Sequence, residues 1–406
     1  PHDDVESNMS RAGHHGIDPE HEINAVEVLD HLVNRAVTMG ASDIHIEPKR
    51  KGVNIRFRID GVMCEQGALP AEIGPSLATR IKVLSRIDMT IRRLPQDGQC
   101  SLELEDDRLV HLRVSTFPAI HGETIVLRLL LGHSLIPLDK LGMDDNVRTE
   151  VEHLTSLSSG LILVCGPTGS GKTSTLYSML QQLDTDNLNV VTLEDPIEVE
   201  FDRVTQGQTN ERGGLTFAAG LRAILRQDPD VIMVGEMRDA ETAQIALQAS
   251  LTGHLVMSTL HTSNTVETIA RVIDLGAEPW IVANSLQAII AQRLVRRLCH
   301  KCSEVMSAPA DFTAGDHDPR VIIKKGQAIR GAAGCEVCHD TGYIGRMGIF
   351  EVLTLDDTLR DLVKERASTR AYREHLNSRG GGTLREVGLQ RVLSGHTTLA
   401  EVLRVT

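Results

Sequence analysis

The sequence predicts an α/β protein whose main domain is a parallel β-sheet with helices on both of its faces. Four short runs of nearly continuous apolar residues support this prediction, because strands that are buried on both faces have this composition. Segments with helical periodicity separate the runs, and this alternation is typical of parallel sheets. The runs occupy 161–164, 190–193, 231–234 and 255–259.

A smaller domain is predicted ahead of the main one. Residues 1–24 show no apolar periodicity, and we expect a disordered arm or linker there. Apolar residues at helical spacing over 26–37 predict a helix. Polar and apolar residues then alternate, as at 43–47 and 53–59, which predicts strands with one buried face. Residues 25–137 are therefore expected to form a mixed α/β domain.

The rest of the chain divides into three further segments. The main domain is expected over 138–298 and to end in a helix near 286–298. A module rich in cysteine and glycine follows at 299–348. Apolar periodicity predicts a helical region at 349–406.

Composition and charge narrow the classes of function. With 406 residues, the chain is longer than one typical domain, and its formal net charge of −13 disfavours a protein that mainly coats nucleic acid. No apolar run approaches the ~20 residues that span a bilayer, so any membrane association is expected to be peripheral. Seven cysteines without an export signal favour reduced thiols in the cytosol. Because the chain begins with Pro1, we expect a longer natural protein.

A glycine-rich loop lies between the first apolar run and the next helical segment. Its glycines allow backbone N–H groups to face phosphate oxygens, and the following helix N-terminus adds partial positive charge. Lys172 would reach the β- and γ-phosphates of ATP, and Thr173 would offer its hydroxyl to Mg²⁺. A chance glycine-rich turn is the alternative, expected in roughly one chain of this length in a hundred. The loop reads Gly166, Pro167, Thr168, Gly169, Ser170, Gly171, Lys172 and Thr173.

Acidic residues at the ends of two apolar runs are candidates for the chemistry of hydrolysis, which needs a group that orients water. Glu236 follows the third run and is the candidate base. Gly235 occupies the place where many such enzymes have a Mg²⁺-associated aspartate, so Glu194 or Asp195 is expected to hold Mg²⁺ or its waters. The alternative is that these acids cap helices.

Positive charge that stabilises the transferring phosphoryl group could come from four arginines. Arg222 and Arg226 are spaced i and i+4 on one expected helix face, and both could address phosphate. Arg113 and Arg128 lie on expected strands of the first domain and could act as arginine fingers. Solvated surface arginines are the alternative. His261 follows the fourth run, where a γ-phosphate sensor and a structural histidine are both open.

Four cysteines form two C-x2-C pairs, Cys299 with Cys302 and Cys335 with Cys338. Four thiolates suit a closed tetrahedral Zn²⁺ site, which is structural because it leaves no open position for a substrate. The 32 residues of 303–334 between the pairs exceed the usual ~15–20. A redox dithiol is the alternative, although nothing here resembles the βαβ setting of a thioredoxin site.

Together these motifs resemble the type II secretion and type IV pilus assembly ATPases, a branch of the RecA-like P-loop superfamily. The resemblance covers about residues 25–406. Beside the glycine-rich loop, it rests on ASDIHIE at 41–47, RFRIDG at 56–61, PQDG at 95–98, HGE at 121–123, EDPIE at 194–198, RQDPD at 226–230, GE at 235–236, TGH at 252–254 and TLHT at 259–262.

The resemblance implies a homo-hexamer with a PAS-like first domain and a RecA-like ATPase domain. Such a ring would hydrolyse ATP and power assembly of a type II secretion pseudopilus or a type IV pilus through an inner-membrane platform. We therefore expect a cytoplasmic protein that is recruited to the inner face of the inner membrane and has no nucleic-acid partner. A tetracysteine module favours assembly motors over retraction motors. An N-terminal domain that docks on a membrane partner is expected to precede this sequence.

Residue roles also follow from the resemblance. It implies catalytic roles for Glu236 and Glu194, and His261 joins them as a candidate. The implied charge-stabilising residues are Arg113, Arg128, Arg222 and Arg226. Two other hypotheses stay open: a translocase or helicase acting on nucleic acid, and a nucleotide-binding scaffold without turnover.

Overall fold

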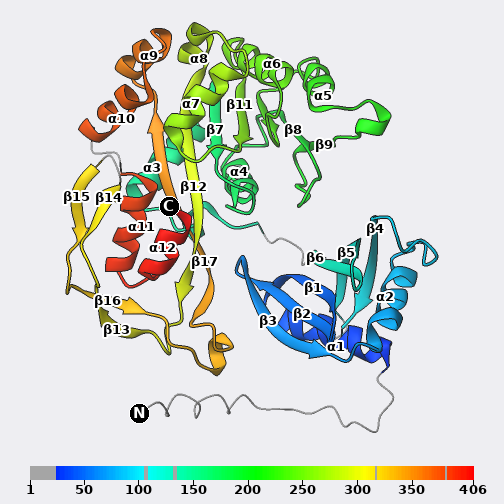
Figure 1. Cartoon of the computed structure of the whole chain (residues 1–406). Coiled ribbons are helices and arrows are strands. Elements are labelled where there is room, and N and C mark those ends of the chain that lie inside the picture. Colours follow the sequence, from blue (N-terminus) through cyan, green and yellow to red (C-terminus); the bar gives the residue numbers. More distant parts are fainter. Residues whose placement is uncertain (1–23, 105–107, 131–134, 316–317, 380–381) are drawn as a thin grey trace. The chain divides into compact units, whose positions relative to one another are not determined.

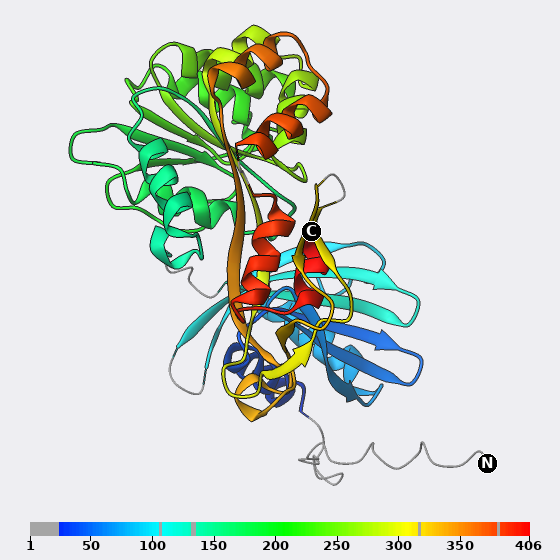
Figure 2. The same cartoon turned by 90° about the vertical axis from the view of Figure 1, so that its left-hand side faces the viewer.

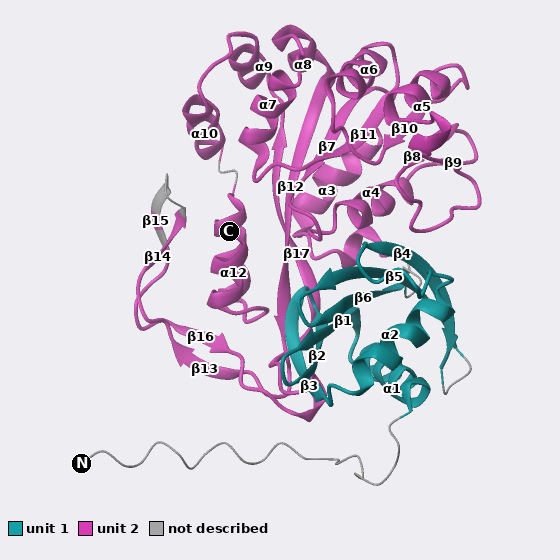
Figure 3. Cartoon of the chain, turned by 45° about the vertical axis from the view of Figure 1, so that its right-hand side comes forward, with its two compact units in different colours: residues 1–131 teal, residues 132–406 magenta. Residues whose placement is uncertain are grey.

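The chain folds into two compact units, residues 1–131 and 132–406, in the computed structural model (Figure 1, Figure 3). The predicted arm at 1–24 lies outside the described residues, except for Asn24. The structure describes residues 24–104, 108–130, 135–315, 318–379 and 382–406.

The first unit is a six-stranded antiparallel sheet in the order β3-β2-β1-β6-β5-β4, with two helices on one face. Leu29 and Leu77 of the helices pack with Phe57 of the sheet, which confirms the predicted smaller mixed domain. Its elements are α1 Ala25–Thr38, β1 Ala41–Lys49, β2 Gly52–Ile59, β3 Val62–Leu69, α2 Ile73–Leu84, β4 Gln96–Glu103, β5 Leu109–Ala119 and β6 Gly122–Leu130.

The second unit contains a seven-stranded sheet in the order β17-β12-β7-β11-β10-β8-β9. Its strands pair in parallel, apart from the antiparallel pair β12 and β17. The elements are α3 Asp145–Thr155, β7 Gly160–Cys165, α4 Lys172–Leu180, β8 Val190–Glu194, β9 Thr205–Gln208, α5 Phe217–Ile224, β10 Val231–Val234, α6 Ala240–Leu251, β11 Leu255–Leu260, α7 Thr265–Asp274, α8 Pro279–Ser285, β12 Leu286–Leu298 and β17 Tyr343–Thr354.

Helices cover both faces of this sheet, as predicted from the apolar runs. Successive strand residues point to opposite faces. Leu161 and Leu163 of β7 therefore pack in one core, which includes residues of α5 to α8. Ile162 and Val164 pack in the other core, against α3 and α4. The predicted parallel α/β fold is confirmed.

The predicted helix near 286–298 is wrong, because these residues form the strand β12. A short apolar run does not distinguish a strand from a buried helix by periodicity alone. Pairing with distant strands makes this segment a strand, because β12 lies parallel to β7 on one side and antiparallel to β17 on the other. Figures 1 and 2 show that β12 and β17 extend beyond the other strands as a long ribbon.

Two small two-stranded sheets form between the cysteine pairs, and four helices follow β17. β17 itself crosses the predicted boundary between 348 and 349. Contacts of α11 with β17 and of α12 with β12 place these helices beside the ribbon (Figure 2). The helical tail is confirmed. The elements are β13 Glu304–Ser307, β14 Phe312–Gly315, β15 Asp318–Ile323, β16 Ala328–Gly331, α9 Asp357–Lys364, α10 Thr369–Ser378, α11 Leu384–Leu393 and α12 Leu399–Val405.

Each tail helix begins at a residue whose side-chain oxygen accepts a hydrogen bond from a backbone N–H of its first turn. Such N-caps satisfy backbone donors that have no partner within the helix. The four capping residues are Asp356, Ser368, Thr383 and Thr398. Among the described residues, no helix is both long and apolar enough to cross a bilayer.

Candidate functional site

The glycine-rich loop connects the buried strand β7 to α4, which is the predicted strand, loop and helix. Lys172 is the first residue of α4, and its Nζ donates to the carbonyl oxygens of Gly166 at 2.9 Å and Pro167 at 3.1 Å. The ammonium group therefore lies over the loop. Burial lowers the pKa of Lys172, whereas the negative charge of Glu236 acts in the opposite direction. The loop follows β7 and Glu236 follows β10, and both strands pair in parallel with β11, so the loop and Glu236 lie at the same edge of the sheet.

Two loop positions require glycine for both conformation and space. Gly166 and Gly171 have φ angles of 152° and 88°, which side chains rarely adopt. A Cβ atom would lie 2.6 Å from the carbonyl oxygen of Gln292 at Gly166, and 2.8 Å from Gln292 Nε2 at Gly171. The loop is therefore held tightly against β12.

Ser170 adds a sign that the loop suits a phosphate. Ser170 is buried, and its hydroxyl has no hydrogen-bond partner among the described residues. Buried polar groups in proteins are normally paired, with protein groups or with water. A phosphate oxygen would supply the missing partner.

Glu236 and His261 meet at the ends of β10 and β11. The carboxylate of Glu236 is largely buried and contacts Arg238 Nε, while its other oxygen lies 3.2 Å from His261 Nε2. The backbone N–H of Met237 donates to the Thr259 carbonyl at 3.1 Å, which fixes the two strand ends together. The structure thus brings the phosphate loop, Glu236 and His261 to the same edge of the sheet.

Glu194 is also at this edge but is enclosed by neutral donors. Thr192 Oγ1 donates to its carboxylate at 2.6 Å, Gln206 Nε2 at 3.1 Å, and the hydroxyl of Tyr177 contacts its second oxygen. Burial and this hydrogen bond raise the pKa of Tyr177. Asp195, the alternative candidate, is exposed. Any role of Glu194 toward Mg²⁺ stays a prediction.

The two arginines predicted on one helix face have partners of their own. Arg222 of α5 pairs with Glu241 of α6, and both side chains are about half exposed. Arg226 lies beyond the end of α5, and its Nη1 donates to the Arg222 carbonyl at 2.8 Å. Among the described residues, no hydrogen bond or ion pair joins either arginine to the loop. Their roles therefore stay predictions.

Arg113 and Arg128 belong to the first unit, where they stand opposite each other on β5 and β6. Asp43 is the register partner of Arg128 on β1, and Arg128 Nε lies 2.8 Å from Asp43 Oδ1. Both arginine side chains are exposed. The two cations therefore share one open face of the sheet, and their role toward phosphate stays a prediction.

Three residues near the site were not predicted from the sequence: Tyr177, Arg238 and Gln292. Gln292 had a visible signal, because it is the first polar residue after the apolar segment 288–291. Tyr177 had none, since its contact with Glu194 depends on how α4 and β8 meet. Arg238 is only two residues from its partner Glu236, but the spacing alone did not reveal their contact.

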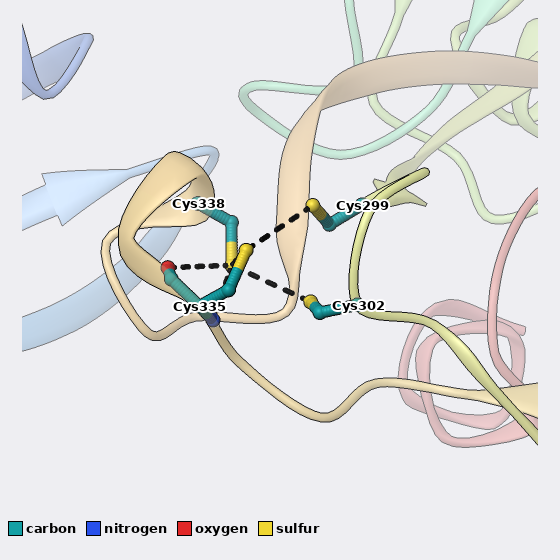
Figure 4. Close-up of side chains that lie close together, drawn as sticks. All are labelled: Cys299, Cys302, Cys335 and Cys338. Atoms are coloured by element: carbon teal, nitrogen blue, oxygen red, sulfur yellow. Dashed lines mark hydrogen bonds between the residues drawn. The ribbon is translucent and has the colours of Figure 1, made fainter.

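The four paired cysteines converge in one cluster, as predicted (Figure 4). Their Sγ atoms all lie within 4.8 Å of one another, with Cys299 and Cys335 at 3.9 Å and Cys302 and Cys338 at 3.7 Å. Four sulfurs bound at ~2.3 Å to a tetrahedral Zn²⁺ would be roughly 3.8 Å apart. The donor set and its spacing therefore fit a structural zinc ion.

Backbone groups around the cluster support thiolate charge. The N–H of Gly334 points to Cys302 Sγ at 3.3 Å, and that of Gly342 points to Cys338 Sγ at 3.1 Å. Gly334 and Gly342 have φ angles of 127° and 75°, so these two turns favour glycine.

Comparison with known proteins agrees with this geometry. Residues 19–404 match the family described as "Type II/IV secretion system protein". The type II secretion system ATPase E of Vibrio cholerae serotype O1 is 44% identical over 395 residues, which are 96% of this chain and 77% of that protein.

Two of the solved structures that resemble this chain cover more than nine tenths of it. The pilus retraction motor PilT with bound ADP is 28% identical, with a TM-score of 0.59 over 93% of this chain and 96% of that one. The ATPase DotB of Legionella pneumophila has a TM-score of 0.69 over 96% of this chain and 97% of that one. At 21% identity, this second likeness shows the fold alone.

These similarities confirm the predicted enzyme class, an ATPase, and the RecA-like fold of its main domain. The family match spans both units and the cysteine cluster. The chain belongs to the type II/IV secretion system protein family.

Proposed function

We propose that this chain hydrolyses ATP at the glycine-rich loop. One observation carries the proposal: the loop that precedes Lys172 and the pair Glu236 and His261 lie at the carboxyl edge of one parallel sheet, where ligands of such folds bind. An incoming nucleotide would replace the loop carbonyls as the partner of Lys172, and Thr173 would hold Mg²⁺. Glu236 would orient the attacking water, and His261 would sense the γ-phosphate through its contact with Glu236.

We further propose that six copies of the chain form a ring that powers a secretion or pilus machine. The names of the relatives support secretion, and the resemblance described above supports a pseudopilus or pilus assembled through an inner-membrane platform. The ring would act in the cytoplasm at the inner face of that membrane. Charge at the transferring phosphoryl group would come from Arg113, Arg128, Arg222 and Arg226, supplied within a subunit or by its neighbour.

Phosphate release by the purified protein tests the enzymatic proposal. Lys172→Ala is expected to lower turnover on the order of 10²–10³-fold, because it removes a preorganised positive charge from the phosphates. Lys140→Ala, at an exposed lysine, is the matched control and should keep wild-type turnover. Background phosphate release by the wild type would favour the scaffold hypothesis, whereas DNA-stimulated release that falls with salt would favour a translocase.

We also propose that the four cysteines hold one structural Zn²⁺ per chain. Zinc removal should destabilise the cysteine module, because ligation contributes directly to folding at such sites. Metal analysis is expected to find one zinc per wild-type chain and none after Cys299→Ser. Cys100→Ser, outside the cluster, should retain the metal. A wild-type protein without stoichiometric zinc would overturn this assignment.

A further inference from the structure

β12 lies beside the phosphate loop and carries a buried amide there. The parallel register of β12 with β7 ends at Ala291 opposite Cys165, the residue before the loop. Gln292 is the next residue of β12 and is 1% exposed. A fully buried amide is costly unless its polar atoms are paired, so its contacts are informative.

Gln292 contacts both ends of the phosphate loop. Its Oε1 accepts a hydrogen bond of 2.6 Å from Thr175 Oγ1, in the first turn of α4. Its Nε2 lies against Gly171, and its backbone carbonyl lies against Gly166, in both cases too close for a Cβ atom. One residue therefore limits the positions of the first and last glycines of the loop and of the helix that follows.

Arg293 extends these contacts to two other segments. Its Nη1 donates to the carbonyl of Gln292 at 2.9 Å, the same carbonyl that faces the loop. Its Nη2 donates to the Ser263 carbonyl at 2.6 Å, two residues after His261, and its Nε donates to the Val405 carbonyl at 3.1 Å. Arg293 thus joins the histidine-bearing loop and the last residue of α12 to the strand that supports the phosphate loop.

We propose that Gln292 is a positioning residue of the phosphate loop, and that Arg293 couples nucleotide binding in that loop to the docking of α12. Preorganised loop donors bind phosphate better because they need no rearrangement on binding. Movement of the loop would shift the position of the Gln292 carbonyl. Because Arg293 donates to this carbonyl and to that of Val405, the shift would also alter the contact with Val405. The proposal rests on the proposed function, since it takes the ligand to be a nucleotide.

Binding of fluorescent ADP and steady-state ATP turnover test the role of Gln292. Gln292→Leu removes the acceptor for Thr175 and is expected to weaken ADP binding by about 10- to 100-fold, as loop groups lose their alignment. Gln287→Leu is the matched control, because Gln287 is on the same strand but pairs with Arg360 instead of the loop. It should bind ADP like the wild type.

A second variant keeps this test decisive if Gln292→Leu does not fold. Thr175→Val removes only the hydroxyl that donates to Gln292, and it should also weaken ADP binding. In a folded Gln292→Leu protein, adding Thr175→Val should cause little further loss, because interacting groups are not additive. Thr175→Ser should restore wild-type affinity.

The results separate this inference from the proposed function. If the wild type itself binds no nucleotide, the proposed function fails. If the wild type binds ADP and both Thr175→Val and any folded Gln292→Leu bind it equally well, the positioning role of Gln292 is overturned.

Amide hydrogen exchange tests the coupling through Arg293. Saturating ADP is expected to slow exchange in 399–405 of the wild type by about 5-fold or more, the lower end of known couplings between sites. Arg293→Met should abolish this protection while the protein still binds ADP. Wild-type exchange in α12 that is unchanged by ADP, or protection that persists in Arg293→Met, would overturn the coupling.

Discussion

A glutamate lies at the end of each of two neighbouring strands, β8 and β10, but the surroundings of the two carboxylates differ. Glu194 accepts hydrogen bonds from three uncharged side chains and is 3% exposed. Glu236 contacts Arg238 and His261, and its charge acts on Lys172. The two strands pair directly, so their position in the sheet does not explain this difference.

The contrast indicates different tasks for the two acids. The oxygens of Glu194 are already occupied by donors from α4, β8 and β9, an arrangement that fixes these elements together. Glu236 instead interacts with Arg238 and His261, whose side chains are about half exposed. An acid in such a setting can orient water, whereas an enclosed acid must first give up a donor.

The largest expected effect is that of Glu236→Gln. Loss of the water-orienting carboxylate should lower kcat on the order of 10²–10⁴-fold while ADP binding is retained. Phosphate release and fluorescent ADP binding measure the two effects, with Glu152→Gln, on the surface of α3, as the control. Normal turnover in Glu236→Gln would contradict a catalytic task for Glu236 that Glu194 lacks.

A third carboxylate sharpens the comparison, because Glu401 is as buried as Glu194 but has cationic partners. Burial raises its pKa, yet hydrogen bonds from Arg404 and Arg296 outweigh burial and lower the pKa to about 2. The unfolded chain therefore takes up this proton first as the pH falls. The stabilisation is complete above about pH 5 and is lost toward pH 2.

Urea unfolding across this pH range measures the contribution of Glu401. The difference in free energy of unfolding between the wild type and Glu401→Gln should shrink by at most ~3 kcal/mol between pH 6 and pH 2. A difference that is independent of pH would show that the two arginines do not stabilise the ionised carboxylate.

The smallest expected effect is that of Tyr177→Phe. It removes one donor from Glu194 and should lower the free energy of unfolding by about 1–3 kcal/mol. If Glu194 is mainly structural, turnover should change by less than about tenfold, equivalent to ~1.4 kcal/mol in the barrier. A loss of turnover as large as that of Glu236→Gln would instead place Glu194 in the catalytic machinery.

The sequence was most informative where local chemistry determines structure. The glycine-rich loop and the cysteine cluster each depend on residues whose type or spacing admits few alternatives, and the helical tail was predicted from its apolar periodicity. Buried strands such as β7 and β11 were predicted for the same reason, because continuous apolar runs followed by turns are distinctive.

Features that depend on distant pairing were not predicted. β12 was taken for a helix, and β17 was not predicted as a strand, because neighbours far along the chain stabilise them. β3 was also not predicted, although it pairs with the adjacent strand β2. The enclosure of Glu194 depends on Tyr177 and Gln206, which come from elements on either side of it in the sequence. Spacing alone did not reveal these contacts.

The place of β17 in the sheet also affects how the protein is made. A nascent chain emerges N-terminus first at about 5–20 residues per second, so β12, which ends at Leu298, is complete seconds before β17, which begins at Tyr343. Until β17 arrives, one edge of β12 has no partner along a stretch that includes the apolar residues Ile289 and Ile290. Unpaired apolar edges invite pairing with other chains. The risk of aggregation at this edge should therefore persist for those seconds, until β17 pairs with β12.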